Sequence, residues 1–277
     1  MKKIFSFYIA VIFVFLSCKD ENVLRKSELV STQACEDYLL IENILLDIDE
    51  NIEQAFRDNG ISKGYPNYTL KNFNYSFPQD TLDTLIVDFG NSNILYPNPG
   101  GKLRKGKIIS EFTGKYHDSL SIINISFDNY QVNNYLVEGE IVIINNGKNI
   151  QGNSVYLISS NNMSVSNNSR GKIDWQVNIS KEWINGEETF FNKNDDGFIL
   201  NGTSSGNSTN NNNFSSTIMS PLIIEYNCLY GCLVTSGEVK LTPDGYEDRI
   251  IDYGNEGCDC NVVIITNSET YPKIILN

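Results

Sequence analysis

Histidine is nearly absent from the sequence, which has a single one, His117, among 277 residues. A serine nucleophile needs a histidine beside it, and hydrolytic zinc sites commonly draw on several histidines, so both chemistries have little to work with. The sequence also lacks a P-loop and a G-x-G-x-x-G motif after a strand. His117 lies in GKYHDSL, where we expect a turn. We therefore expect no enzyme, no cofactor and no metal ion.

Positive charge is also scarce. The chain has 21 lysines and arginines against 34 aspartates and glutamates, which gives a formal net charge of -13. An acidic surface repels nucleic acid and anionic lipid headgroups. We therefore expect no nucleic-acid partner.

An apolar run long enough to cross a membrane as a helix is missing. The apolar stretch Ile4–Leu16 follows Lys2 and Lys3 and spans 13 residues, whereas a bilayer core of ~30 Å takes about 20 helical residues. A short positive region before a short apolar core is typical of a secretory signal peptide. We assign residues 1–17 to a signal peptide; the alternative is a buried N-terminal helix.

The end of this signal, LSC with its last residue at Cys18, resembles the lipobox of bacterial lipoproteins. In that family the signal is cut before the cysteine, whose thiol then carries diacylglycerol and whose amine is acylated. Several acyl chains together give durable membrane anchoring. The following KDE resembles the export tag of Bacteroidota surface lipoproteins, although a plain solvated tether is the alternative. The resemblance implies a lipidated polar tether at 18–34 on an outer-membrane protein, surface-exposed or facing the periplasm.

A helix is predicted after the tether. Apolar residues recur at helical spacing at positions 41, 45, 48, 52 and 56. Ser31 or Thr32 can cap the start, and Asn59-Gly60 can supply a left-handed stop. We predict helix over about 36–58, within a segment 35–60, and expect its apolar stripe to pack on a sheet.

The remainder, 61–277, has the period of β-strands. Ile173, Trp175, Val177 and Ile179 alternate with polar residues, which predicts a half-buried strand. Asn-Gly and Asp-Gly pairs at 146, 185, 196 and 201, with Pro-Asp-Gly at 243, predict tight turns. The polar run 203–217 (TSSGNSTNNNNFSST) predicts a long, weakly ordered hairpin tip.

Four short phrases suggest an internal repeat: GKII at 106, GEIV at 139, GKID at 171 and GEVK at 237. Their offsets are 33, 32 and 66 residues, and chance is the alternative. The fold class we predict is mainly β, an antiparallel meander forming a sandwich, a curved sheet or an open barrel, with one N-terminal helix.

Longer phrases resemble a family of uncharacterised Bacteroidota outer-membrane lipoproteins. They are LIVDFG at 85–90, RKGKIISEFTGKYHDSLSIINISFDNYQVNNYLVEGEIVIINNG at 104–147, GTSSG at 202–206 and the ending IIDYGNEGCDCNVVIITN. The resemblance covers most of residues 83–277. It implies the same cellular location and fold, but no activity. The chain departs from the family pattern GDGTCDN by reading GNEGCDC, which adds Cys260.

Cysteines cluster near the C-terminus at Cys228, Cys232, Cys258 and Cys260. An exported protein meets an oxidising compartment, where disulfides are the default. A bond between 258 and 260 would close a strained ring, so we expect 228 and 232 to pair with 258 and 260 in either order. A four-thiolate zinc site is the alternative. Cys35 is free, buried in the helix face, or an intermolecular link.

Several other residues are weaker candidates. Asn192–Gly197 has the start of a calcium loop, but Thr203 stands where the bidentate glutamate belongs, so a polar turn is the better interpretation. A hydrolase would need converging carboxylates, for example around Asp174, Glu182 or Glu188.

Three Asp-Ser/Thr-Leu tripeptides resemble the acceptor of Bacteroidota O-glycosylation and place candidate sites at Thr81, Thr84 and Ser119. Ordinary turn chemistry is the alternative. Aromatic faces suit sugar rings, so Trp183, before the Asn185-Gly186 turn, is a candidate exposed glycan contact, whereas Trp175 is expected in the core.

The expected function is a non-catalytic binding or structural component of the bacterial envelope, of unknown molecular activity. The first alternative is surface glycan binding that assists polysaccharide capture; a glycoside hydrolase is the less favoured one. Expected partners are the outer membrane, through the anchor, and an envelope protein or polysaccharide.

Overall fold

The structure is a computed structural model that describes residues 31–61, 66–71, 82–96, 101–228, 232–255, 257–267 and 269–274. The signal peptide, Cys18, most of the tether and Thr81 lie outside the described residues.

The described chain begins with one α-helix, α1 (Gln33–Arg57), and continues almost entirely as strands. The strands are β1 (Asn67–Lys71), β2 (Asp83–Asp88), β3 (Ile94–Tyr96), β4 (Lys102–Phe112), β5 (Ile122–Val132), β6 (Tyr135–Glu138), β7 (Ile141–Lys148), β8 (Ser154–Asn167), β9 (Gly171–Asn185), β10 (Gly197–Asn207), β11 (Asn213–Glu225), β12 (Val234–Pro243), β13 (Arg249–Asp252), β14 (Asn261–Thr266) and β15 (Glu269–Ile274). Two 3₁₀ turns, η2 (Glu187–Thr189) and η3 (Lys193–Asp195), lie between β9 and β10.

The strands form one 15-stranded sheet in which neighbours along the chain mostly pair, so the predicted antiparallel meander is confirmed. The path runs β1-β2-β4-β5-β6-β8-β9-β10-β11-β12-β13-β14-β15, with β3 beside β4 and β7 between β5 and β8. Hairpins make each new pairing local, which is why period-two sequence with frequent turn signals folds this way.

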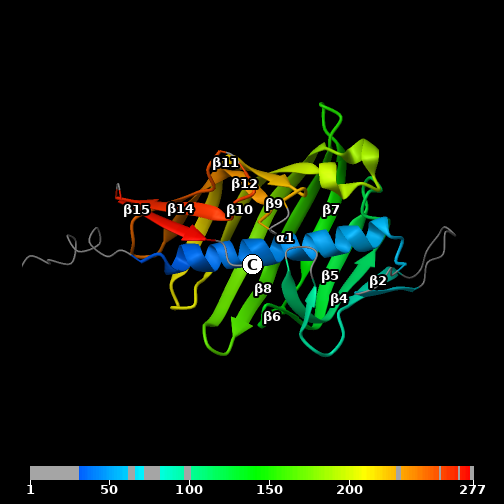
Figure 1. The fold of residues 1–277 in the computed structure, drawn as a ribbon, viewed down its shortest axis with the longest axis horizontal. Helices are drawn as coiled ribbons and strands as arrows, with labels where there is room; N and C mark the ends of the chain where they lie inside the picture. Colours follow the sequence, from blue (N-terminus) through cyan, green and yellow to red (C-terminus); the bar gives the residue numbers. More distant parts are fainter. Residues whose placement is uncertain are drawn as a thin grey trace, which may run out of the picture.

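Helix α1 lies across the sheet, at a steep angle to the long strands (Figure 1). Of its 25 residues, 19 are buried. Strands far apart in the sheet reach it, since Lys102 of β4, Lys181 of β9 and Lys273 of β15 all bond to its acidic side chains. The sheet therefore curves around the helix, and the helix fills its hollow.

The predicted helix is confirmed, with a small shift at its start. The helix ends with Asn59 in the left-handed region at a φ of 52°, and the Gly60 amide donates to the Ala55 carbonyl at 2.9 Å. Thr32 occupies the N-cap position, but its hydroxyl makes no capping bond. It donates instead to the Glu36 carboxylate at 2.7 Å.

Two predicted Asn-Gly turns are wrong. Asn146-Gly147 lies within β7, at a shift of the pairing register between Asn145 and Lys148. Asn201-Gly202 lies in the middle of β10, where the pairing register shifts. Gly202 has a φ of +139°, and a Cβ there would collide with the Asn178 carbonyl of β9. This Asn-Gly pair marks a β-bulge, which needs the same positive φ as a hairpin turn.

The hairpin predicted over 203–217 is present, but most of the segment is strand. Residues from Thr203 to Asn207 pair in register with residues from Asn213 to Thr217. The tip docks on the start of α1, because the Thr209 amide and hydroxyl donate to Asp37 at 2.8 and 2.9 Å. The prediction of a weakly ordered tip is therefore wrong.

Candidate functional site

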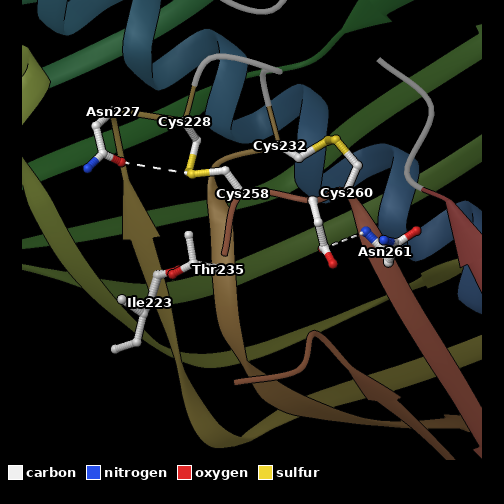
Figure 2. Close-up of a disulfide and its surroundings, with 9 residues drawn as sticks. Ile223, Asn227, Cys228, Cys232, Thr235, Cys258, Cys260 and Asn261 are labelled. Atoms are coloured by element: carbon white, nitrogen blue, oxygen red, sulfur yellow. Dashed lines mark hydrogen bonds between the residues drawn. A yellow bond between two sulfur atoms is a disulfide. The ribbon is translucent and has the colours of Figure 1, made fainter. Parts of the chain in front are cut away.

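Two disulfides join the segment after β11 to the loop before β14. Cys228 pairs with Cys258 and Cys232 pairs with Cys260, so the predicted cross-pairing is confirmed and its order is set. Figure 2 shows the two sulfur–sulfur bonds near each other, with Asn227 on one side and Asn261 on the other. Because the four sulfurs are bonded in pairs, they are not the thiolates that a zinc site would require.

The remaining described cysteine, Cys35, is free and fully buried in α1. Burial raises the pKa of its thiol to about 12. A buried thiol held protonated is a poor nucleophile. Of the three predicted roles, the structure supports a buried core residue and leaves no exposed sulfur for an intermolecular bond.

The most charged part of the interior is the buried side of α1. Asp47 is bound by Arg104 and lies 3.3 Å from the Lys102 ammonium. The Tyr130 hydroxyl donates to the same carboxylate at 3.1 Å. Burial alone would raise the pKa of Asp47, but the Lys102 and Arg104 charges hold it below its ordinary value.

A second ionic cluster lies further along the helix, at Asp49, Glu53 and Arg57. The Lys181 ammonium donates to Asp49 at 2.6 Å and to Glu53 at 3.2 Å. Arg57 bridges Glu53 and Asp196 at 2.6 and 2.5 Å. Burial would raise the pKa of Glu53, but the Lys181 and Arg57 charges lower it to about 2. Glu53 is held ionised by fixed cations, which suits a structural role better than proton transfer, whereas burial raises the pKa of Asp196 to about 7 despite the Arg57 charge.

Glu42 is a half-buried acid of α1 whose hydrogen-bond partners are tyrosine hydroxyls. It accepts hydrogen bonds from the Tyr38 and Tyr253 hydroxyls, and burial raises its pKa to about 7. The adjoining cavity between α1 and β9–β11 holds about 30 Å³. That volume accommodates about one or two water molecules and no larger ligand.

His117 lies in the predicted turn, but its ring is packed inside. The ring lies 5.2 Å from that of Trp183 and 4.6 Å from that of Phe190, centroid to centroid. Burial lowers the pKa of His117 to about 4, and the Arg57 and Lys181 charges add to the effect. The imidazole is therefore neutral at physiological pH and sits among aromatic rings.

One motif escaped the sequence analysis: Gly202–Gly206 reads GTSSG and so matches G-x-S-x-G. In hydrolases that pattern places the serine on a sharp turn between a strand and a helix. Here Ser204 lies within β10, and its hydroxyl is hydrogen-bonded to that of Ser216 on β11 at 2.6 Å. The context of a nucleophile is missing, so the motif carries no catalytic assignment.

Trp183 is not the exposed glycan contact that the sequence predicts. Its side chain is 1% exposed, its indole N–H donates to the Asn185 carbonyl at 2.5 Å, and Arg57 lies over its ring at 5.1 Å. Its ring lies on the inward side of β9. Trp175 is 3% exposed and lies in the core, as predicted.

Two of the three candidate hydrolase carboxylates, Asp174 and Glu182, do not converge, and the third, Glu188, lines a surface depression with Glu187 and Asp195. Asp174 and Glu182 are eight residues apart on β9, which corresponds to about 26 Å along a strand. Asp174 pairs with Lys172 at 2.7 Å, and Glu182 accepts two amide hydrogen bonds at 2.8 Å. Glycosidase pairs lie ~5–9.5 Å apart, so Asp174 and Glu182 cannot form one; Glu188 is exposed beyond the end of β9.

The calcium-like segment is a polar turn, as the sequence favours. Lys193–Asp195 forms η3, and Asp196 turns inward to its ion pair with Arg57. Thr203 lies in β10, across the bulge.

Two of the three candidate O-glycosylation residues are described. Thr84 lies in β2 between β1 and β4, so its tripeptide is a strand and not the turn that was expected. Ser119 is exposed in the turn before β5, and Asp118 caps that turn by accepting from the Lys115 amide at 2.8 Å. Ser119 is therefore the accessible one of the two.

Two open depressions on the surface of the described residues are of ligand size. One, of about 620 Å³, lies at the end of β9 beside Lys148, Asn153, Glu187 and Asp195; Lys148 and Glu187 form an ion pair across 3.0 Å there. The other, of about 580 Å³, lies on β8–β11 and is lined by amide and hydroxyl side chains together with Asp174, Met163, Trp175 and Phe214. Small-molecule sites fall in this range of volumes.

No protein-family model, curated protein or solved structure matches this chain. Within the described ranges, no helix is both long and apolar enough to span a membrane.

Proposed function

We propose that the protein is a bacterial outer-membrane lipoprotein, anchored through Cys18, that serves as a non-catalytic binding or structural component of the envelope. The observation that carries the anchor is the short apolar signal ending in Cys18 and followed by a polar, acidic tether. The KDE tag favours the cell surface over the periplasmic face. The two disulfides support an exported address, because disulfides persist in oxidising compartments.

The arrangement of charges supports a non-catalytic role. The buried acids of the two ionic clusters are bound to Arg57, Arg104 or Lys181. A general acid or base needs a pKa near the working pH and access to substrate. Glu42 and Asp196 have such a pKa, but Glu42 adjoins a cavity of only about 30 Å³ and Asp196 is buried in its ion pair with Arg57. The glycoside hydrolase alternative therefore has little support.

Because the interior is filled by α1, we expect ligands to bind on the outer surface. A curved sheet can hold a ligand in its hollow, but here α1 occupies the hollow and 19 of its residues are buried. We infer that partners, whether an envelope protein or a polysaccharide, bind the outer surface. The acidic charge continues to argue against nucleic acid.

Replacement of the lipidated cysteine tests the anchor. We expect Cys18→Ser to release soluble protein or to leave uncleaved precursor, because the acyl chains cannot be added. The measurement is membrane fractionation with immunoblotting, and Cys35→Ser, at a buried cysteine outside the signal, is the control. Unchanged membrane retention of Cys18→Ser would contradict the proposal.

Cross-linking on intact cells tests the binding role. A reproducible protein partner, identified by mass spectrometry, would make the chain a subunit of an envelope assembly. Cross-links confined to the chain itself or to polysaccharide would favour glycan capture.

A further inference from the structure

Much of the outward side of β9, β10 and β11 carries uncharged polar side chains, although Lys172, Asp174 and Glu182 of β9 and Met219 of β11 are outward as well. We call this surface the amide–hydroxyl face. It consists of Gln176, Asn178, Ser180, Asn201, Thr203, Ser205, Asn207, Asn213, Ser215 and Thr217. The opposite, inward positions of β9 hold Trp175, Val177 and Ile179.

The strand register arranges this face in rows. Gln176, Ser205 and Ser215 are paired across the three strands, and Asn178, Thr203 and Thr217 form the next row. Strand geometry separates neighbours by about 4.8 Å across a row and by about 6.8 Å along a strand. The rows place hydrogen-bond donors and acceptors at regular intervals on a rigid central part of the sheet.

A depression lies at one end of the amide–hydroxyl face. It holds about 580 Å³ and is lined by Gln176, Ser205 and Asn207 of the face, together with Asn161 and Asn162 of β8. The two β8 asparagines lie at a register shift between Ser160 and Met163. A bulge re-aims side chains, and here it adds two exposed amides to the rim.

Most of these polar groups are free to bind a ligand. Asn207 donates to Asn213 at 3.0 Å, but Gln176, Asn178 and Ser205 make no side-chain hydrogen bond with any other described residue. Folding does not use them, because they point to solvent. A ligand could therefore bond to them without breaking protein contacts.

The absence of charge on this face indicates the chemistry of the ligand. The whole chain has a formal net charge of -13, yet the face itself holds no charged side chain: Lys240 of β12 borders it, and Asp174, which lines the depression, is paired with Lys172 at 2.7 Å. A charged polymer finds no complementary ion here, whereas a neutral polyhydroxylated chain finds donors and acceptors at every position.

We propose that the amide–hydroxyl face and its depression bind a neutral glycan chain through hydrogen bonds and bridging water, without aromatic stacking. The inference rests on the proposed binding function and names its ligand class. It replaces Trp183 as the glycan contact, because the face is exposed where Trp183 is buried.

Affinity electrophoresis of the full mature chain in detergent tests this site. Native gels would contain mannan, xylan or dextran as neutral probes, and alginate as the acidic one. We compare the wild type with Gln176→Ala/Asn161→Ala, whose side chains are exposed in the depression. Asn124→Ala, an exposed outward amide on β5, is the matched control. A thermal melt verifies that each variant is folded.

We expect at least one neutral probe to retard the wild type and the Asn124→Ala control equally. The double variant should bind about tenfold more weakly, because it loses two hydrogen-bonding side chains. The inference is overturned if no neutral probe retards the wild type, if alginate retards it as strongly, or if the double variant matches the control.

The failure of this inference and that of the proposed function are distinguishable. Lack of retardation overturns the glycan site alone. Reducing ends released from a probe would contradict the non-catalytic role, and retention of Cys18→Ser in the membrane would contradict the anchor.

Discussion

Lys181 provides the sharpest test of the helix-filled fold. Its ammonium lies 2.6 Å from Asp49 and 3.2 Å from Glu53, and the three side chains are 1%, 3% and 1% exposed. The Tyr226 hydroxyl lies 3.3 Å from the same nitrogen. One cation on β9 thus neutralises two acids of α1.

Lys181→Met removes this charge and keeps most of the volume of the side chain. Asp49 would then be left buried without Lys181, while Glu53 would keep only Arg57, and removing one partner of a buried ion pair costs about 3–5 kcal/mol. Lys181 helps to hold the pKa of Glu53 at about 2, so the pKa of Glu53 rises in the variant. The low pKa of Glu53 stabilises the wild type above pH 4.5, and this contribution is lost as the pH falls toward 2. The difference in unfolding free energy between wild type and variant therefore shrinks as the pH falls.

Urea unfolding with intact disulfides measures the effect, at pH 7 and at pH 3. The control is Lys240→Ala, whose partner Asp248 is 2.7 Å away at the surface. Exposed pairs contribute about 0–1 kcal/mol. If Lys181→Met lowers the free energy of unfolding no more than Lys240→Ala does at pH 7, these ion pairs do not hold α1 against the sheet. That result would contradict the buried position of Lys181.

Three further predictions follow from other buried groups. Trp183→Ala should lower the free energy of unfolding by about 3–5 kcal/mol in urea titrations, and a loss below 1 kcal/mol would mean that the ring is exposed. Replacement of all four paired cysteines, Cys228, Cys232, Cys258 and Cys260, by alanine should cost about 3–4 kcal/mol, since it opens a loop with a sequence separation of 30 residues; an unchanged urea midpoint would contradict the pairing. His117 should lower the free energy of unfolding by about 2–3 kcal/mol at pH 4 relative to pH 7. The reason is that the imidazole of the unfolded chain takes up a proton below about pH 6.5, whereas that of the folded chain does so only near pH 4. His117→Asn should lose less stability over that interval, and an equal loss would refute a buried neutral imidazole.

The elements of the fold could be predicted because their signals are local. Helical spacing and the Asn59-Gly60 stop predict α1, and alternation predicts β9. Asn201-Gly202 misled the prediction because a bulge and a hairpin turn require the same backbone conformation.

The ionic core could not be read from α1 alone. Asp47, Asp49 and Glu53 fall on what looks like a solvated face, and only the curvature of a sheet built much later in the chain buries them. A signal was nevertheless present on the strands. Lys181 stands in the inward, apolar phase of β9, and Arg104 does so in β4, so buried acidic partners could have been expected.

The candidate binding surface was missed for a different reason. Polar residues at 203–217 look like a low-complexity loop, and only pairing of β9, β10 and β11 shows that they form rows. Trp183 failed as a site because sequence adjacency to a turn does not determine which side of the sheet a side chain faces.

The central claim is that Cys18 anchors this chain in a bacterial outer membrane. The most direct test is mass spectrometry of the N-terminal peptide of the protein purified from its native membrane. We predict that residues 1–17 are absent and that the peptide begins at Cys18, with diacylglycerol on the thiol and an acyl group on the amine. A peptide that keeps Met1, or one that begins elsewhere with an unmodified Cys18, would contradict the account.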